Sequence, residues 1–283
     1  MYKYFIFIST IIFSSCNIIN KNEPKFGIIK INGFKVEANG NDYGSLNSKI
    51  NSVWVSYNGV SQGVYELPAE IPLLEGENKN LILSAGVKKN GISESIIDYP
   101  LYDALFDTIS VNENFYKNYD TISIKYLQAA SLKFNENFEI GNNFFEDLDG
   151  NTETNVLPII NQNVFEGNKS GYIQLNSQTN AKIEVAGTAF NLTKGKKHFL
   201  ELNYKCNIPF KIGLVGNNEF NQVIKTPILT INKKTDYNKI YIQLNSISDN
   251  LISNYYKIFI LAEKPSDVQI GEIFLDNVKV LEM

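Results

Sequence analysis

Apolar and polar residues alternate with a period of two along most of this chain, which is the spacing that puts successive side chains on opposite faces of a β-strand. Residues 53–57 (VWVSY) and 64–67 (VYEL) flank the pair Asn58-Gly59, with a second glycine at Gly63. Two strand-like runs around an Asn-Gly pair predict a β-hairpin. The first half contains no run of 12 residues with helical apolar spacing, so it is predicted to be all-β.

The second half shows the same strand period at regular intervals over about 150 residues, which predicts a β-sandwich of two sheets. The predicted fold class is therefore all-β, with two β-sandwich domains: a small N-terminal one at residues 26–129 and a second one at residues 130–283. The segments that carry the pattern in the second half are residues 164–177, 199–216, 239–246, 255–263 and 271–282.

The first 16 residues have the pattern of an export signal. Lys3 precedes an apolar run at residues 5–13, which is too short for a membrane-spanning helix of about 20 residues. The run ends in Phe13-Ser14-Ser15-Cys16. We expect residues 1–15 to be a cleaved signal peptide and residues 16–25 to be a polar tether. The alternative is a buried first strand that ends in an ordinary cysteine.

Phe13-Ser14-Ser15-Cys16 resembles the lipobox of bacterial lipoproteins, in which a bulky apolar residue and two small residues precede the cysteine that receives the lipid. The resemblance implies that Cys16 carries acyl chains such as palmitate and that the protein is anchored in a membrane of the cell envelope. Asn17, rather than Asp, follows the cysteine. This favours the outer membrane or cell surface over the inner membrane.

Composition supports a folded protein and argues against nucleic acid as a partner. Of the 283 residues, 43% are hydrophobic and 12% aromatic, so there is enough apolar material for real cores. The formal net charge is -4, and no basic face is visible that would match a phosphate backbone.

Cysteine and histidine usage limits the possible nucleophilic chemistry. Apart from Cys16 the only cysteine is Cys206, so no intrachain disulfide is expected once Cys16 is lipidated. Cys206 shares one face of its strand pattern with apolar residues, whereas Glu201 lies on the other face, so we predict a buried, inert thiol. The only histidine, His198, follows a lysine-rich stretch and is expected in a solvated turn. A Ser-His-Asp site is therefore not expected.

Residues 53–92 resemble the small β-sandwich surface modules of the PEGA type, because a strand, a glycine turn, a glycine-containing return and a final hairpin follow one another there. They also resemble the N-terminal part of a group of Gram-negative envelope lipoproteins. The resemblance implies an immunoglobulin-like sandwich and brings no catalytic residues.

Three short segments resemble the jelly-roll fold of galactose-binding-like domains and carbohydrate-binding modules: residues 137–139, 167–172 and 274–278. The resemblance implies a structural Ca²⁺ held by Glu139 and Asp276, because many members bind calcium where the first and last strands meet. Without this ion, no cofactor is expected. The acidic loop 147–153 begins like a calcium loop, and a solvated loop is the alternative.

Sugar binding by such a fold uses aromatic side chains, because the C–H faces of a pyranose stack on π-systems. The candidate residues are tyrosines on polar strand faces or in loops, and the alternative is that they are strand residues with surface hydroxyl groups. These candidates are Tyr172, Tyr237, Tyr241 and Tyr255.

The sequence favours a lipid-anchored, non-catalytic envelope protein that presents a carbohydrate-binding-like jelly roll, with a glycan as partner. A structural or assembly subunit that docks another envelope protein is the alternative. A glycan-active enzyme comes third, because no catalytic motif is present and nothing in the sequence pairs two carboxylates across a cleft.

Overall fold

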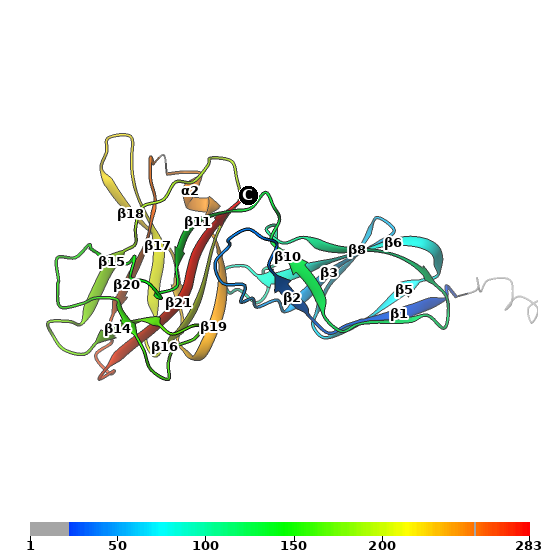
Figure 1. Ribbon diagram of the computed structural model, residues 1–283, viewed down its shortest axis with the longest axis horizontal. Helices are drawn as coiled ribbons and strands as arrows, with labels where there is room; N and C mark the ends of the chain where they lie inside the picture. The colour runs from blue at the N-terminus through cyan, green and yellow to red at the C-terminus, as the bar shows by residue number, and fades with distance from the viewer. Residues whose placement is uncertain (1–22, 252) are drawn as a thin grey trace, which may run out of the picture.

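The computed structural model describes residues 23–251 and 253–283. The predicted signal peptide, Cys16 and most of the predicted tether lie outside the described residues. The prediction of an all-β protein is confirmed: two β-sandwiches lie end to end along the long axis, and the short helix α2 (Asn245–Ser248) joins two strands of the second (Figure 1). None of the described helices is long and apolar enough to span a membrane.

The first sandwich packs a five-stranded sheet against two smaller sheets. The five-stranded sheet has the order β4 (Val60–Glu66), β3 (Ser52–Tyr57), β6 (Gly76–Lys88) and β7 (Ile96–Asp98), and β8 (Ala104–Val111) also pairs with β6. The smaller sheets are β5 (Ala69–Leu74), β1 (Phe26–Ile31) and β9 (Tyr116–Tyr119), and β2 (Phe34–Glu37) with β10 (Ile122–Lys125). Strands β1 and β9 are parallel, as are β2 and β10.

The predicted hairpin is confirmed as β3 and β4. Asn58 and Gly59 form its two-residue turn, with φ angles of 51° and 77°. Positive φ at both central positions is what the favoured hairpin turn requires, and Asn-Gly adopts it at low cost. The register shifts between Val55 and Ser56, opposite Gly63, which has a φ of 111°. The second glycine therefore marks a β-bulge.

The second sandwich has the alternating strand order of a jelly roll, in which the chain crosses repeatedly between two sheets. The six-stranded sheet contains β13 (Leu157–Ile159), β14 (Ser170–Leu175), β21 (Gly271–Glu282), β16 (His198–Cys206) and β19 (Lys234–Gln243), with β11 (Ser131–Glu136) paired to β21. The opposite sheet contains β12 (Glu146–Asp147), β15 (Lys182–Ala186), β20 (Lys257–Glu263), β17 (Phe210–Asn217) and β18 (Val223–Ile231).

Strand β16 shows how the period of two builds the core. Leu200, Leu202 and Cys206 face inward and belong to the core cluster of the second sandwich. The predicted buried thiol is confirmed, because Cys206 is free and buried. Burial raises the pKa of this thiol to about 11, so it is protonated and unreactive at neutral pH.

The first sandwich packs against the outer face of the six-stranded sheet. Phe199 and Tyr241 on this outer face belong to the hydrophobic cluster of the first sandwich. The ring of Tyr99, from the first sandwich, lies 5.0 Å from the ring of each of these residues. A backbone hydrogen bond of 2.7 Å from Asn90 N to Tyr241 O also crosses the junction. The two sandwiches therefore share an interface with aromatic contacts on this sheet face.

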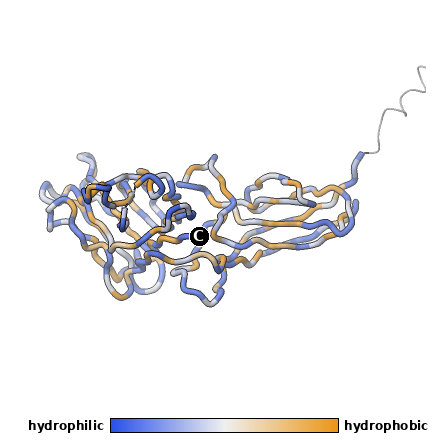
Figure 2. The backbone as a smooth tube through the Cα atoms, turned by 90° about the horizontal axis from the view of Figure 1, so that it is seen from above, coloured by the Kyte–Doolittle hydropathy of each residue, from blue (hydrophilic) through white to orange (hydrophobic). Residues whose placement is uncertain are grey.

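The described chain begins at the end of the first sandwich that is farthest from the second. Strand β1 starts at Phe26 at this far end, and both views place the second sandwich at the opposite end of the molecule (Figures 1 and 2). The start of β1 is therefore separated from the second sandwich by the length of the first.

Gly213→Ala is expected to destabilise the second sandwich by about 1–3 kcal/mol, because overpacking forces a backbone shift. Gly213 lies in β17, which pairs with strands on both sides, and a Cβ there would lie 2.3 Å from Thr226 O and 2.8 Å from Pro227 Cα. Urea unfolding measures the loss. Gly141→Ala is the matched control, since nothing lies within 4 Å of its added Cβ. Equal stability of the two variants would contradict this prediction.

Candidate functional site: the outer face of the six-stranded sheet

The outer face of the six-stranded sheet continues beyond the area that the first sandwich covers, and we call this part the open half. Ile173 and Leu275 point into the core, so the alternation turns Tyr172 and Phe274 outward on the adjacent strands β14 and β21. Tyr237 faces outward from β19, the strand on the other side of β16. Aromatic rings thus lie on both sides of this open half.

These outward rings form two contacting pairs. The ring centroids of Tyr172 and Phe274 are 4.9 Å apart with an interplanar angle of 32°. Those of Phe165, in the loop before β14, and Tyr237 are 4.8 Å apart. Lys205 on β16 lies beside the first pair, with its Nζ 5.2 Å from the centre of the Phe274 ring. Phe165, Tyr172 and Tyr237 are partly exposed, whereas Phe274 is 5% exposed beneath the Lys205 side chain.

Hydrogen bonds from the two tyrosine hydroxyl groups fix the ring orientations. Tyr172 donates to Glu272 Oε1 at 2.8 Å, and Tyr237 donates to the carbonyl oxygen of Asn163 at 2.8 Å. Burial raises the pKa of each tyrosine to about 12, and the bond to Glu272 adds to this for Tyr172. Both hydroxyl groups therefore remain protonated donors, and both rings are held before any ligand arrives.

A cleft of about 570 Å³ lies beside Phe274 on this face. Its volume is in the range of ligand-binding clefts, and its walls combine an aromatic ring with amide, hydroxyl and charged groups. We call it the aromatic cleft. It is lined by Lys205, Cys206, Asn207, Lys233, Lys234, Thr235, Glu272 and Phe274.

The four tyrosines chosen from the sequence do not lie together. Tyr172 and Tyr237 share the outer face of the six-stranded sheet, whereas Tyr255 precedes β20 of the opposite sheet, with Lys257 Nζ 5.4 Å from its ring centre. The expectation that Tyr241 lies on an accessible face is wrong. Tyr241 is 2% exposed, because the first sandwich covers it, and its hydroxyl oxygen accepts a hydrogen bond of 2.9 Å from Lys49 N.

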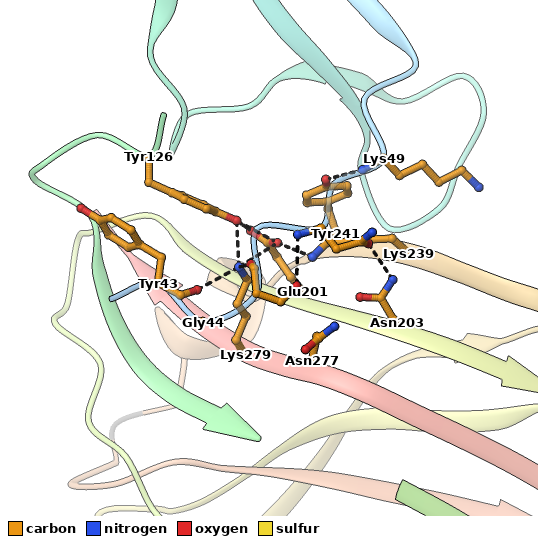
Figure 3. Close-up of polar contacts among 12 residues, drawn as sticks. Tyr43, Gly44, Lys49, Tyr126, Glu201, Asn203, Lys239, Tyr241, Asn277 and Lys279 are labelled. Atoms are coloured by element: carbon orange, nitrogen blue, oxygen red, sulfur yellow. Dashed lines mark hydrogen bonds and ion pairs between the residues drawn. The ribbon is translucent and has the colours of Figure 1, made fainter. Parts of the chain in front are cut away.

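A buried ionic cluster lies where the first sandwich covers the sheet (Figure 3). The Glu201 carboxylate lies 2.8 Å from Lys239 Nζ and 3.7 Å from Lys279 Nζ. It also accepts hydrogen bonds from the hydroxyl groups of Tyr99 at 2.7 Å and Tyr126 at 3.0 Å. Although burial disfavours the charged form, the two lysines outweigh it, and the pKa of Glu201 falls to about 2.

Lys279 connects this cluster to the segment between β2 and β3. Its Nζ donates to the carbonyl oxygens of Tyr43 at 2.9 Å and Ser45 at 2.5 Å. Burial lowers the pKa of Lys279 to about 8, against the attraction of Glu201. Between these carbonyls lies Gly44, which has a φ of +67° and whose added Cβ would lie 2.7 Å from Asn135 Oδ1. A side chain at position 44 would have to displace the Asn135 side chain and adopt this positive φ, both of which glycine avoids.

The Glu201 cluster is a feature that the sequence analysis missed, since Glu201 was expected on a strand exterior. Glu201 is fully buried and stays ionised at neutral pH, so it has no proton to donate as a general acid. Its partners Lys239 and Lys279 are also buried, on the neighbouring strands β19 and β21. The geometry fits a role in joining the two sandwiches.

The two carboxylates proposed for calcium hold the same loop, which precedes β14. Glu139 Oε1 accepts backbone hydrogen bonds from Asn168 at 2.7 Å and Lys169 at 2.9 Å. Asp276 Oδ2 accepts a side-chain hydrogen bond of 2.7 Å from the Ser170 hydroxyl group. Burial raises the pKa of Asp276 to about 6. Within residues 23–251 and 253–283 no three or more His, Cys, Asp or Glu residues gather as metal ligands. The calcium site stays a prediction.

The acidic loop at residues 147–153 uses its oxygens within the protein. Asp147 Oδ1 accepts backbone hydrogen bonds from Asp149 at 3.0 Å and Gly150 at 2.8 Å. Asp149 Oδ2 accepts one of 3.0 Å from Glu184 N. These hydrogen bonds form a polar turn, and the bond from Glu184 N to Asp149 links the turn to β15.

The expectation of a solvated turn at His198 is wrong. His198 is 1% exposed at the start of β16, with Nδ1 2.9 Å from Ser248 Oγ and Nε2 3.4 Å from the Glu282 carboxylate. Helix α2, which contributes Ser248, packs on this strand and removes the ring from water. Burial lowers the pKa of His198 despite the nearby Glu282. The His198 side chain therefore has a structural role in the packing of helix α2 on β16.

No protein-family model matches this sequence, and no curated protein matches it either. Among solved structures, the chain is similar to CBM22-1–GH10 modules of the Clostridium thermocellum xylanase 10B in complex with xylohexaose. The identity is 14% and the TM-score 0.40, over 53% of this chain and 28% of that one.

Two further solved structures are similar to this chain at comparable levels. One is a structure of carbohydrate-binding modules from the β-sandwich superfamily, described for their promiscuous specificity. Its identity is 13% and its TM-score 0.42, over 92% of this chain and 99% of that one. The other is the K3 cleaved adhesin domain of Lys-gingipain from Porphyromonas gingivalis, with 14% identity and a TM-score of 0.38 over 54% and 99%.

Proposed function

We propose that this protein is a non-catalytic, lipid-anchored carbohydrate-binding protein of the cell envelope, in which the first sandwich is a spacer and the second binds the glycan. The observation that carries the proposal is the pair of fixed aromatic contacts, Tyr172 with Phe274 and Phe165 with Tyr237, on the open half of the sheet beside the aromatic cleft.

The chemistry of this surface suits a sugar. A pyranose offers apolar C–H faces, which pack on aromatic rings, and hydroxyl groups, which need polar partners. Tyr172 and Tyr237 are only partly buried, and Lys205, Asn207 and Glu272 supply donors and acceptors around the cleft. Because hydrogen bonds already hold both tyrosine rings, little side-chain entropy is lost when a ligand packs on them.

The position of β1 supports the anchoring part of the proposal. A lipid at Cys16 would attach the chain just before β1, at the end farthest from the aromatic cleft (Figure 1). The first sandwich then holds the binding face away from the membrane. The shared aromatic interface with Tyr99 restricts hinge motion between the two sandwiches.

The double variant Tyr172→Ala/Tyr237→Ala is expected to weaken glycan binding by about tenfold, since an aromatic contact contributes about 0.5–1.5 kcal/mol beyond its buried area. Affinity electrophoresis in gels that contain a panel of soluble polysaccharides, xylan included, measures the retention. Tyr172→Phe is the matched variant, because it keeps the ring and loses only the hydrogen bond to Glu272. Tyr255→Ala on the opposite sheet is the control.

The proposal fails if the wild-type protein is not retained by any polysaccharide of a broad panel. It also fails if Tyr255→Ala weakens retention as much as the double variant does. Circular dichroism of each variant verifies that the fold is intact.

The second candidate function is a structural subunit that docks another envelope protein. It is favoured by large apolar side chains that are exposed before β14, including Ile140 at 100%, Phe145 at 69% and Ile160 at 76%. Apolar surface of this kind is typical of protein-binding sites when it is contiguous. Absence of glycan retention, together with co-purification of one envelope protein after crosslinking in cells, would favour this function.

A further inference from the structure

A second cavity, distinct from the aromatic cleft, lies at the junction of the two sandwiches. Its volume is about 340 Å³. The linker before β3, the end of β6 with the turn after it, the end of β18 with the turn after it, and β19 line it, together with Tyr204 of β16. It adjoins the aromatic cleft, because Lys233 and Lys234 line both. We call it the lysine pocket.

All the charged residues that line this pocket are positively charged. Five of its lining residues are lysines and none is Asp or Glu; the lysines are Lys49, Lys88, Lys233, Lys234 and Lys239. Lys239 has an ion-pair partner, Glu201, behind the pocket wall. Among the residues that the structure describes, the other four have no carboxylate within ion-pair distance.

The lysines come from both sandwiches and act on one another. Lys49 donates a hydrogen bond to Asn238 Oδ1, and Figure 3 shows its side chain extending away from Glu201. Partial burial lowers the pKa of Lys49, and the charges of Lys234 and Lys88 lower it further. Like charges so close destabilise each other, and a bound anion would remove this cost.

Neutral polar groups complete the pocket and suit an oxyanion. The lining includes the side chains of Asn51, Asn90, Ser93, Thr230 and Asn232, each of which has a hydrogen-bond donor. Tyr204 and Tyr241 supply aromatic surface to the wall. The volume of about 340 Å³ suits a small molecule and is far too small for a polymer strand to enter along its length.

We propose that the lysine pocket binds a small oxyanion, a sulfate or phosphate group either free or esterified to a monosaccharide, with Lys49, Lys88 and Lys233 as its main charged partners. Because Lys49 and Lys88 belong to the first sandwich and Lys233 to the second, the bound anion bridges the two. The proposal is independent of sugar binding in the aromatic cleft.

Isothermal titration calorimetry and thermal unfolding test the pocket in the full mature chain. The probes are inorganic sulfate, inorganic phosphate, glucose 6-sulfate and glucose 6-phosphate, with glucose and with sodium chloride at matched ionic strength as controls. We expect a rise in melting temperature with the oxyanions that chloride does not reproduce, since a ligand of the folded state stabilises it. Binding at least tenfold tighter for the sugar esters indicates an esterified ligand, and equal affinity indicates the free anion.

The variant Lys49→Gln/Lys88→Gln/Lys233→Gln is expected to weaken oxyanion binding by at least tenfold, without lowering the melting temperature of the unliganded protein. The matched control is Lys35→Gln/Lys194→Gln/Lys211→Gln, which changes the net charge equally at exposed lysines outside the pocket. Tyr172→Ala/Tyr237→Ala should bind the oxyanion as the wild type does, which separates this proposal from glycan binding.

Three results would overturn the proposal. One is that no oxyanion shifts the melting temperature more than chloride does. Another is an equal loss of binding in the control triple variant, which would assign the effect to net charge alone. The third is a pocket variant that binds oxyanions as tightly as the wild type.

Discussion

Replacing Glu201 with alanine is expected to lower the free energy of unfolding by about 3–5 kcal/mol, because it leaves buried charges without compensation. Lys239 and Lys279 lie 2.8 and 3.7 Å from the Glu201 carboxylate, and all three residues are buried. The hydroxyl groups of Tyr99 and Tyr126 would lose their acceptor as well. Urea unfolding at pH 7 measures the loss.

Two comparisons separate charge from packing at this site. Glu201→Gln keeps an oxygen for the tyrosine hydroxyl groups but removes the charge, so we expect it to remain clearly destabilised. Glu201→Gln/Lys239→Met/Lys279→Met removes all three charges, and we expect it to be more stable than Glu201→Gln alone. Glu219→Ala, at an exposed glutamate, is the control.

The same cluster makes the stability of the folded protein depend on pH in the acidic range. The pKa of Glu201 is about 2 in the folded protein, below its ordinary value of 4.5. A carboxyl group with a depressed folded-state pKa contributes stability above its unfolded pKa and loses it as the pH falls toward the folded pKa. The contribution of Glu201 is therefore complete above about pH 5 and disappears toward pH 2, and Glu201→Gln should flatten this part of the profile.

Either of two results would contradict the assignment of this cluster as the main polar link between the sandwiches. One is a loss in Glu201→Ala no larger than that in Glu219→Ala. The other is an unchanged slope of stability against pH between 5 and 2 in Glu201→Gln.

Cys16→Ser is expected to move the protein from the membrane fraction to the soluble fraction, with both sandwiches folded. Acyl chains contribute about 0.8 kcal/mol per buried CH₂, so loss of the acylated thiol removes the anchor that we propose. The measurement is immunoblotting of fractionated cells, combined with labelling by a palmitate analogue. The described chain starts at the far end of the first sandwich, so we expect no effect on the aromatic cleft.

Cys206→Ala is the matched control, because it removes the other cysteine of the chain, which lies buried in the second sandwich. It should remain membrane-bound and labelled. If Cys16→Ser still incorporates the label or stays in the membrane fraction, lipidation at Cys16 is excluded and another means of attachment is required.

The two candidate sites depend in different ways on how the sandwiches are joined. The aromatic cleft is built within the second sandwich, by Lys205, Glu272 and Phe274 on its own strands. The lysine pocket needs both sandwiches, because Lys49 and Lys88 come from the first. Loosening the junction through Glu201 is therefore expected to affect the lysine pocket more than the aromatic cleft.

Local patterns were sufficient to predict some of the strands, among them β3, β4 and β16. The period of two marks strands whose faces differ, and Asn58-Gly59 adopts positive φ angles that few other pairs tolerate, so the hairpin is encoded within a few residues. The buried thiol of Cys206 follows from the same alternation. Tyr172 and Tyr237 were chosen as exposed aromatic residues on strand faces, and the structure places both on one sheet face.

These local patterns do not predict contacts between segments that are distant in the sequence. The sequence does not show that Phe274 lies beside Tyr172, because the pairing of β14 with β21 brings together residues about 100 positions apart. It also does not show that Phe165 lies beside Tyr237, because the loop before β14 contacts a strand about 70 positions further along the chain. His198 was misplaced for the same reason, since helix α2 covers it from 50 residues further along the chain.

The sequence was enough to predict the all-β class, the positions of strands such as β3, β4 and β16, and the face of β16 that enters the core, because these features depend on neighbours within a few residues. Burial of the opposite face of β16 at Glu201 became visible only from the packing of the two sandwiches. A polar strand face has the same pattern whether water or another domain covers it. Packing of the first sandwich turned solvent-facing positions into a buried ionic cluster, and it gathered lysines from both sandwiches into one pocket.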